Sequence, residues 1–162
     1  MRRALVVVAA IVVVLAAIAA FAPAALVGVA VERLSRGAVS IAESDGTVWH
    51  GRGTLDVQGA ARVPLEWRLD PFALARGEAR MAIAPPSPAL ASPRADFSAR
   101  QDAVTVRALD VALPAQAIAA LAPRAAVRLE GELRVTSPSL EWARGSIGGA
   151  ARVRWSDARF AI

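Results

Sequence analysis

The first strong pattern in the chain is an apolar run from Ala4 to Val31 that contains no charged residue. Two arginines, Arg2 and Arg3, stand directly before it. A bilayer core about 30 Å thick is crossed by roughly 20 apolar residues in a helix, so the run is long enough to span a membrane. The pattern predicts a cytoplasmic start and a single transmembrane anchor over residues 1–31.

A cleaved signal peptide would also combine a basic start with an apolar middle. Ala20 and Ala22 have the spacing of a small-residue cleavage site, but Pro23 follows at once and the apolar run continues beyond it. These two features favour an uncleaved anchor. Basic residues before an anchor favour a cytoplasmic N-terminus, so we expect the rest of the chain to be exported.

Alternation of apolar and polar residues dominates the chain after the anchor. Between Trp49 and Leu69, small or apolar residues fall on the odd positions, whereas charged and polar residues fall mostly on the even positions. A period of two is typical of strands with one buried face and one wet face. We therefore expect a short linker at residues 32–37 and one β domain at residues 38–162.

Turn signals and breaks in the alternation divide this domain into short elements. Asp70 and Pro71, followed by Gly77, indicate one capped helical turn, and the four prolines of residues 85–94 indicate a loop. A shift in the apolar positions predicts a bulge near Ala108. The expected strands are 38–44, 47–57, 62–70, 78–84, 96–100, 103–113, 127–135 and 140–143, then a last strand formed by 151–155 and 158–162, with a helix at 114–121.

The expected fold class is therefore mainly β. It combines an N-terminal single transmembrane helix with a strongly curved antiparallel sheet and one or two short helices. Little helix is available to cover the apolar face of such a sheet. That face must fold over on itself, meet a partner, or hold an apolar ligand.

The composition argues against several chemical functions. The chain has no cysteine and no lysine, and the arginines that give its net charge of +5 are spread singly, so nucleic-acid binding is not expected. His50 is the only histidine and no Gly-x-Ser-x-Gly motif occurs, which argues against a hydrolase. Glu130 and Glu132 have the spacing of a glycosidase pair, but Arg128 and Arg134 flank them in what reads as a solvated charge row. We expect no catalytic residue, metal or cofactor.

Two sets of residues occupy the inward positions of the expected strands. Glycine inside a strand usually marks a bulge or a close approach of another backbone, so we expect the inward glycines to let the sheet bend tightly. The inward tryptophans are expected in the core, with the lining of a lipid groove as the alternative. The glycines are Gly51, Gly53 and Gly131, and the tryptophans are Trp49, Trp67 and Trp155.

Several motifs together resemble one known family. A strand is followed by Gly-Thr-Val-Trp-x-Gly at residues 46–51, and then by Leu-x-Trp-Arg-Leu-x-Pro at residues 65–71. Leu-x-Gly-x-Leu follows at residues 129–133. The motif residues are Gly46, Trp49, Gly51, Trp67, Pro71, Gly77, Gly131 and Trp142. In this arrangement the chain resembles protein N of the bacterial type II secretion system over essentially its whole length.

The resemblance implies a non-enzymatic component of the inner membrane whose periplasmic β domain supports protein export across the outer membrane. It implies other inner-membrane type II secretion proteins as partners. The sheet of this family is also similar to lipid-carrying β-grooves, so the alternative function is a periplasmic lipid-binding or lipid-bridging protein anchored in the inner membrane. Members of the family run longer, so the chain is expected to be a short variant or truncated at its C-terminal end.

The last expected strand ends in apolar residues, with no proline or helix after it to protect its edge. An unprotected apolar edge invites the addition of another strand. We therefore expect Arg154, Phe160 and Ile162 to mark an edge that docks a secretion partner or a second copy of the chain.

Overall fold

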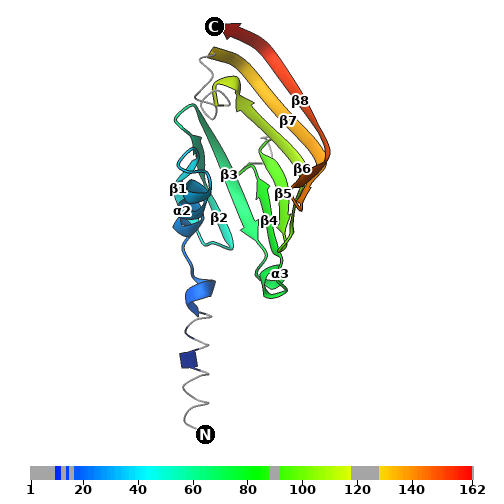
Figure 1. Ribbon diagram of the computed structural model, residues 1–162. Coiled ribbons are helices and arrows are strands. Elements are labelled where there is room, and N and C mark those ends of the chain that lie inside the picture. Colours follow the sequence, from blue (N-terminus) through cyan, green and yellow to red (C-terminus); the bar gives the residue numbers. More distant parts are fainter. Residues whose placement is uncertain (1–9, 12–13, 15–16, 88–91, 118–127, 162) are drawn as a thin grey trace.

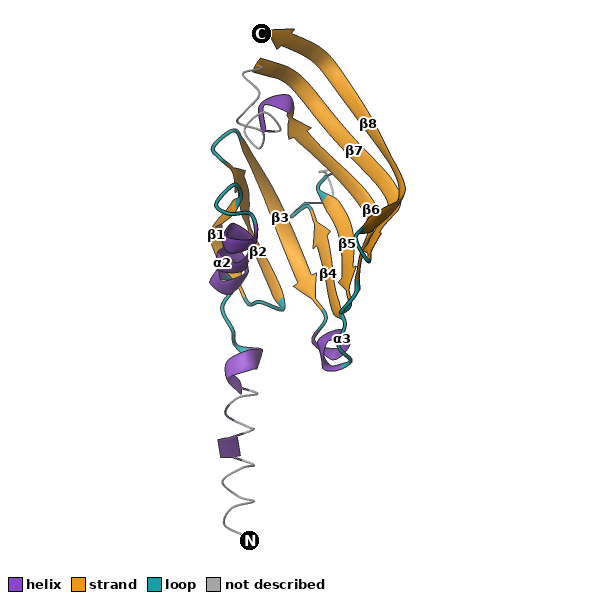
Figure 2. Cartoon of the chain, in the orientation of Figure 1, coloured by secondary structure: helices purple, strands orange, loops and turns teal. Residues whose placement is uncertain are grey.

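The computed structural model describes residues 10–11, 14, 17–87, 92–117 and 128–161. Its body is one antiparallel sheet of eight strands, which curves strongly from its first strand to its last (Figure 1). Short helices, among them α2 (Ala25–Leu34) and α3 (Pro71–Ala75), accompany the sheet (Figure 2). The prediction of a mainly β protein with an antiparallel sheet and short helices is confirmed.

Each strand pairs with its neighbours in the sequence, so the chain order is also the order across the sheet. The strands are β1 (Ser40–Gly46), β2 (His50–Val57), β3 (Ala61–Leu69), β4 (Ala79–Ala84), β5 (Arg94–Ala99), β6 (Ala103–Pro114), β7 (Arg128–Ala143) and β8 (Ser146–Ala161). In antiparallel pairs, residues directly opposite each other point to the same side. The register therefore joins the apolar positions of all eight strands into one continuous apolar face.

The N-terminal helical segment is interrupted before the sheet begins. Residues 17–20 are helical, Pro23 forms an isolated antiparallel bridge with Thr47, and α2 begins at Ala25. A proline lacks the N–H that a continuing helix needs, and its ring clashes with the turn before it, which explains the break. Within the part of the chain that the structure describes, no helix is long and apolar enough to cross a membrane.

The expected anchor over residues 1–31 stays a prediction, because residues 1–9, 12–13 and 15–16 lie outside the described residues. α2 continues to Leu34, into the segment expected as a linker. The amide of Gly37 donates to the carbonyl oxygen of Glu32 over 2.8 Å, and Gly37 has a φ of +80°. A hydrogen bond that spans the last turn and a left-handed residue after it are features of the Schellman motif, which ends the helix here.

α2 packs on the apolar face of the sheet at β1. Ala24, Leu65 and Trp67 are buried together, and Val27 of α2 and Ile41 of β1 pack against them. Burial of such apolar side chains is the main driving force of folding. This cluster is one half of the core and fastens the residues that follow Pro23 to the sheet.

The second half of the core lies where β2 and β3 meet the helical residues 115–117. Val57 and Ala61 are buried against Ala117, and Leu113 packs beside them. Residues 118–121 of the helix expected at 114–121 lie outside the described residues. Both buried clusters therefore involve β2 and β3, the first half of the sheet.

Bulges interrupt the pairing of four strands. The register shifts between Ala42 and Asp45 in β1, at Ala108 in β6, between Thr136 and Ser139 in β7, and at Asp157 in β8. The bulge predicted near Ala108 is present. Bulges bend the strand and increase its twist, which accounts for the strong curvature seen in Figure 1.

Two expectations about the last strands were wrong. β7 is one strand of 16 residues, where separate strands at 127–135 and 140–143 were expected. The β7 bulge accommodates Pro138 without ending the pairing, so the proline is no boundary. β8 begins at Ser146 rather than at Ala151, because Gly148 and Gly149 continue the ladder although they offer no side chain to the pattern.

Candidate functional site

The candidate functional site is the last hairpin of the sheet, formed by β7 and β8. Arg144 and Gly145 have φ values of 50° and 81°, and two successive positive φ values are typical of a type I′ turn. Ala143 and Ser146 close the hairpin as partners. Two strands of 16 residues each therefore run side by side (Figure 1). No described residue pairs with the outer edge of β8.

The bulge in β8 depends on the glycine opposite it. Gly131 has a φ of +105°, and a Cβ there would meet the carbonyl oxygens of Ser156 and, at 2.8 Å, Asp157. Trp155 stabilises β7 and β8 beside this bulge, because its Nε1 donates to the carbonyl oxygen of Glu130 over 2.9 Å. The bulge keeps the positions on both sides of it in register with β7, with Trp155 opposite Leu133 and Arg159 opposite Glu130.

The apolar face of this hairpin is open to solvent. Trp142 is 60 % exposed and Ile147 is 76 % exposed, and Val104 and Val153 are also exposed. Trp155 is 38 % exposed, so the expectation that it lies in the core is wrong. α2 packs on the apolar face at β1 and, through Val27, against Leu65 and Trp67 of β3. No described element covers this face at β8. An exposed apolar patch of this kind is typical of an interaction site.

The polar face of the hairpin is rich in arginine. Arg134 of β7 holds Asp110 of β6 through two hydrogen bonds, of 2.8 Å from Nε and 2.7 Å from Nη2. Those hydrogen bonds lower the pKa of the Asp110 carboxyl. Arg154 lies directly opposite Arg134 in the register, and Arg152 lies opposite Thr136. Arg152 and Arg154 are both exposed and make no ion pair with a described residue.

The residues expected to mark the partner edge fall at different points of this hairpin. Arg154 lies in the middle of β8, and Phe160 near its end pairs with Leu129. Ile162 lies outside the described residues. The assignment of these residues to a docking edge stays a prediction.

The N-terminal motif residues gather where the helical segment meets the sheet. The Trp67 ring lies over Gly51, where a Cβ would collide with it, and the Trp67 Nε1 donates to the carbonyl oxygen of Val48 over 3.1 Å. Trp49 is half-buried and donates to the carbonyl oxygen of Ala19 over 2.7 Å. Gly46 has a φ of +96°. These motif residues hold the N-terminal segment against the sheet.

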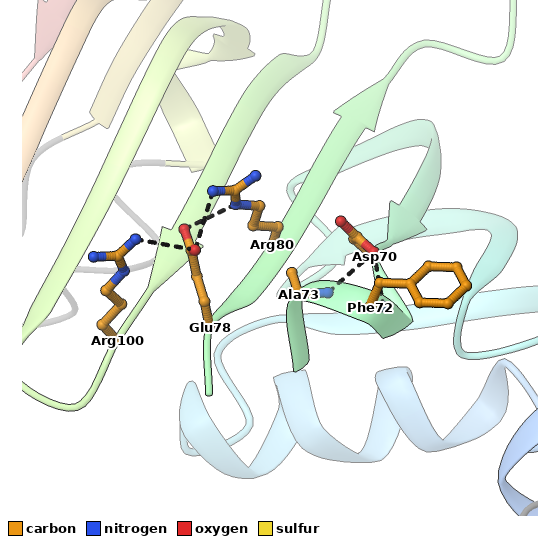
Figure 3. A network of polar contacts seen from close by, with 6 residues as sticks. All are labelled: Asp70, Phe72, Ala73, Glu78, Arg80 and Arg100. Carbon is orange, nitrogen blue, oxygen red and sulfur yellow. Dashed lines mark hydrogen bonds and ion pairs between the residues drawn. The ribbon is translucent and has the colours of Figure 1, made fainter. Parts of the chain in front are cut away.

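The next motif residues shape α3. Asp70 caps the helix, since its carboxylate accepts from the amides of Phe72 at 2.9 Å and Ala73 at 3.2 Å (Figure 3). Pro71 opens the helix, and Gly77 with a φ of +75° follows its end. Gly131 and Trp142 lie elsewhere, in β7. The motif residues therefore sit at separate points of the sheet and do not converge on one site.

A second surface feature is a hollow of about 960 Å³ on the polar face of β3 to β6. At its border Glu78 is buried and accepts two hydrogen bonds from Arg80, of 2.8 and 3.0 Å, and one of 3.2 Å from Arg100 (Figure 3). The Arg80 hydrogen bond, and after it that of Arg100, lower the pKa of the Glu78 carboxyl. This network was missed from the sequence, although Glu78 and Arg80, two positions apart in a strand, were placed to share a face.

The charges around the hollow are balanced. Its lining contains the four arginines Arg68, Arg80, Arg100 and Arg107 and the four carboxylates of Asp70, Glu78, Asp96 and Glu141. A balanced lining does not select for an anion or a cation. Across the described residues, no group of three His, Asp or Glu side chains is arranged to hold a metal ion. The hollow therefore gives less direction to a functional assignment than β7 and β8 do.

These features define an open antiparallel sheet whose exposed surfaces are a strand edge and an uncovered apolar face. The chain belongs to the family described as type II secretion system (T2SS), protein N, whose family model matches residues 37–161. Comparison with curated proteins found no match. Comparison with solved structures found none either. Membership assigns the chain to the type II secretion apparatus of the bacterial envelope and implies contact with other components of that apparatus.

Proposed function

We propose that the chain is a single-pass inner membrane protein that supports secretion as a scaffold and not as an enzyme. In this proposal the part of residues 1–31 that precedes Pro23 forms a cytoplasmic start and an anchor, because Ala24 and Val27 pack on the sheet. The β domain from about residue 38 lies in the periplasm. The apolar run behind Arg2 and Arg3 supports this topology. The family supports the role in secretion.

The observation that carries the scaffold function is the outer edge of β8. A strand of 16 residues, none of whose outer backbone groups pairs with a described residue, offers a long row of donors and acceptors. Extended segments add to such edges through main-chain hydrogen bonds. We propose that another component of the secretion apparatus docks along β8.

Copurification from membranes tests this docking. Arg154→Pro removes a backbone donor from the middle of β8 and disturbs the edge, so we expect it to abolish capture of inner-membrane secretion components while the protein still inserts in the membrane. Thermal unfolding of the variant checks that the sheet is intact. Phe160→Asp gives a second variant near the end of the strand. Undiminished capture by both folded variants would show that β8 is not the docking edge.

A second candidate function is the binding of a lipid on the apolar face. The exposure of Trp142, Ile147 and Val153 favours it, because these side chains extend the apolar face beyond the part that α2 covers. Native mass spectrometry of the detergent-extracted protein should then show acyl-chain adducts that Val153→Asp removes. Leu65 is unsuitable for this test because it is buried in the core. Abundant adducts together with undisturbed capture by Arg154→Pro would favour the lipid function over the scaffold.

A further inference from the structure

In the middle of β8, positively charged and apolar side chains alternate along the strand. Arg152 and Arg154 point to the polar face, and Val153 and Trp155 point to the apolar face. All four are exposed. A strand added beside β8 would place its side chains about 4.5–5.5 Å from these residues, on matching faces. The edge therefore favours a paired segment whose polar and apolar residues alternate in the same register.

Arg152 and Arg154 form no ion pair within the described chain. Other strand arginines have partners, such as Arg52 with Asp45 at 2.8 Å and Arg62 with Asp56 at 3.1 Å. Arg154 has only Arg134 directly opposite, and Arg134 already binds the carboxylate of Asp110. Opposite charges across a strand pair stabilise it, and like charges destabilise it. The open side of β8 therefore favours carboxylates as the next neighbours.

The same arginines disfavour a second copy of the chain at this edge. An antiparallel copy centred on Val153 would place Arg152 opposite Arg154 at two positions. A copy centred on Arg154 would place the two Arg154 side chains opposite each other. Charges that repel the wrong partner are a common source of specificity, and charged side chains on edge strands are a known protection against self-pairing.

From these contacts we infer that β8 binds an extended segment in which acidic residues alternate with apolar ones. The acidic side chains pair with Arg152 and Arg154, and the apolar side chains extend the face of Val153 and Trp155. This inference rests on the proposed docking at β8 and names the chemistry of the docked segment. In the two registers described above, the arginines also oppose pairing of β8 with a second copy.

Binding of synthetic peptides to the full chain in detergent tests the inference by fluorescence anisotropy. One peptide alternates glutamate with valine, and a matched peptide has lysine in place of each glutamate. We expect the glutamate peptide to bind at least about tenfold more tightly, which corresponds to about 1.4 kcal/mol. The double variant Arg152→Glu with Arg154→Glu should reverse this preference.

The control is the double variant Arg33→Glu with Arg36→Glu, which makes the same change of net charge on exposed residues outside the sheet. It should keep the preference for the glutamate peptide. Loss of the preference in the control, or equal binding of both peptides to the wild type, would overturn the inference. If Arg154→Pro still abolishes partner capture in that case, docking at β8 stands with a different chemistry. A dimer in sedimentation that Arg154→Pro dissociates would identify a second copy as the occupant and would also overturn it.

Discussion

Opposite each bulge of the sheet lies one residue with no side chain or only a methyl group. The register places Gly53 opposite the bulge of β1 and Ala95 opposite the bulge of β6. It places Ala151 opposite the bulge of β7 and Gly131 opposite the bulge of β8. A bulge brings two residues against one, so the single residue faces a crowded backbone. At Gly131 this is visible directly, because an added Cβ would meet two carbonyl oxygens. Small residues at these positions allow the sheet to bend.

Gly51 has a different role, since the Trp67 ring covers it. Gly51→Val should therefore lower the free energy of unfolding by about 1 to 3 kcal/mol, because the added side chain displaces a buried ring. The neighbouring exposed residue gives a matched control, and His50→Ala should change the free energy by less than about 0.5 kcal/mol. Denaturant unfolding of the detergent-solubilised chain measures both. A larger effect at His50 would mean that the faces of β2 are exchanged.

The Glu78 carboxyl predicts a pH dependence of stability. Its pKa is lowered in the folded chain by hydrogen bonds from Arg80 and Arg100. A carboxyl with a lowered folded pKa contributes its full stability above its ordinary pKa, near 4.3, and loses that contribution as the pH falls through the folded pKa. The stability gap between the wild type and Glu78→Gln should therefore be present at neutral pH and close in acid.

Denaturant midpoints of the wild type and Glu78→Gln between about pH 7 and about pH 3 measure this gap. Glu141→Gln is the control, because the Glu141 side chain is exposed and forms no ion pair with a described residue. At neutral pH it should leave the midpoint nearly unchanged, because its side chain has no ion pair to lose. A gap that stays constant into acid would show that the Glu78 charge contributes nothing.

The bulges also show what a pattern of residues can reveal. Ala108 and Asp157 lie where the alternation of apolar and polar residues changes parity, so both positions are visible in the sequence. Glu43 is followed by Ser44 and Asp45, and Pro138 lies among Thr and Ser residues. In such polar stretches the sequence does not show which residues face the core. The bulges at Glu43 and Pro138 were therefore not predictable by parity, although Gly53 stood out as an inward glycine.

At the scale of elements, α2 is the helix that could not be distinguished from the predicted anchor in the sequence. The apolar run continues through Pro23 without a polar residue, and a membrane anchor and a helix packed on a sheet can share this composition. The difference lies in tertiary contacts, since Ala24 and Val27 meet residues of β1 and β3 that are distant in the sequence. Periodicity within one segment does not contain that information.

The docking of α2 depends on Gly28, which is buried against β1. A Cβ at this position would lie 3.3 Å from the carbonyl oxygen of Ile41. Gly28→Leu should therefore push α2 away from β1 and lower the free energy of unfolding by about 1 to 3 kcal/mol. Ala30→Leu, on an exposed position of the same helix, should leave it nearly unchanged. Equal effects of both variants would mean that α2 does not pack tightly on the sheet.

At the scale of the whole molecule, the apolar face is covered at one end and open at the other. α2 and residues 115–117 bury it at β2 and β3, whereas Trp142 and Ile147 remain exposed near the far edge. The shortage of helix to cover this face was evident from the sequence. Which end would be covered was not, because it depends on the bend of the sheet and on the packing of α2.

The proposed topology predicts where a unique thiol can be labelled, since the chain has no cysteine. Gln101 is exposed in the turn between β5 and β6. Gln101→Cys should react with a membrane-impermeant maleimide once the outer membrane is opened. A cysteine on an extension before Met1 should react only after the inner membrane is broken. The opposite pattern of labelling would refute a periplasmic β domain.

The order of the strands has a further consequence for how the domain assembles. Every strand pairs with the one just before it in the chain, so each pairing closes a loop that is short for a β protein. A chain delivered across a membrane from its N-terminal end would present β1 first and could add each later strand to a finished edge as it emerges. Growth by single additions leaves only one new strand unpaired at a time, which limits the opportunities for aggregation during export.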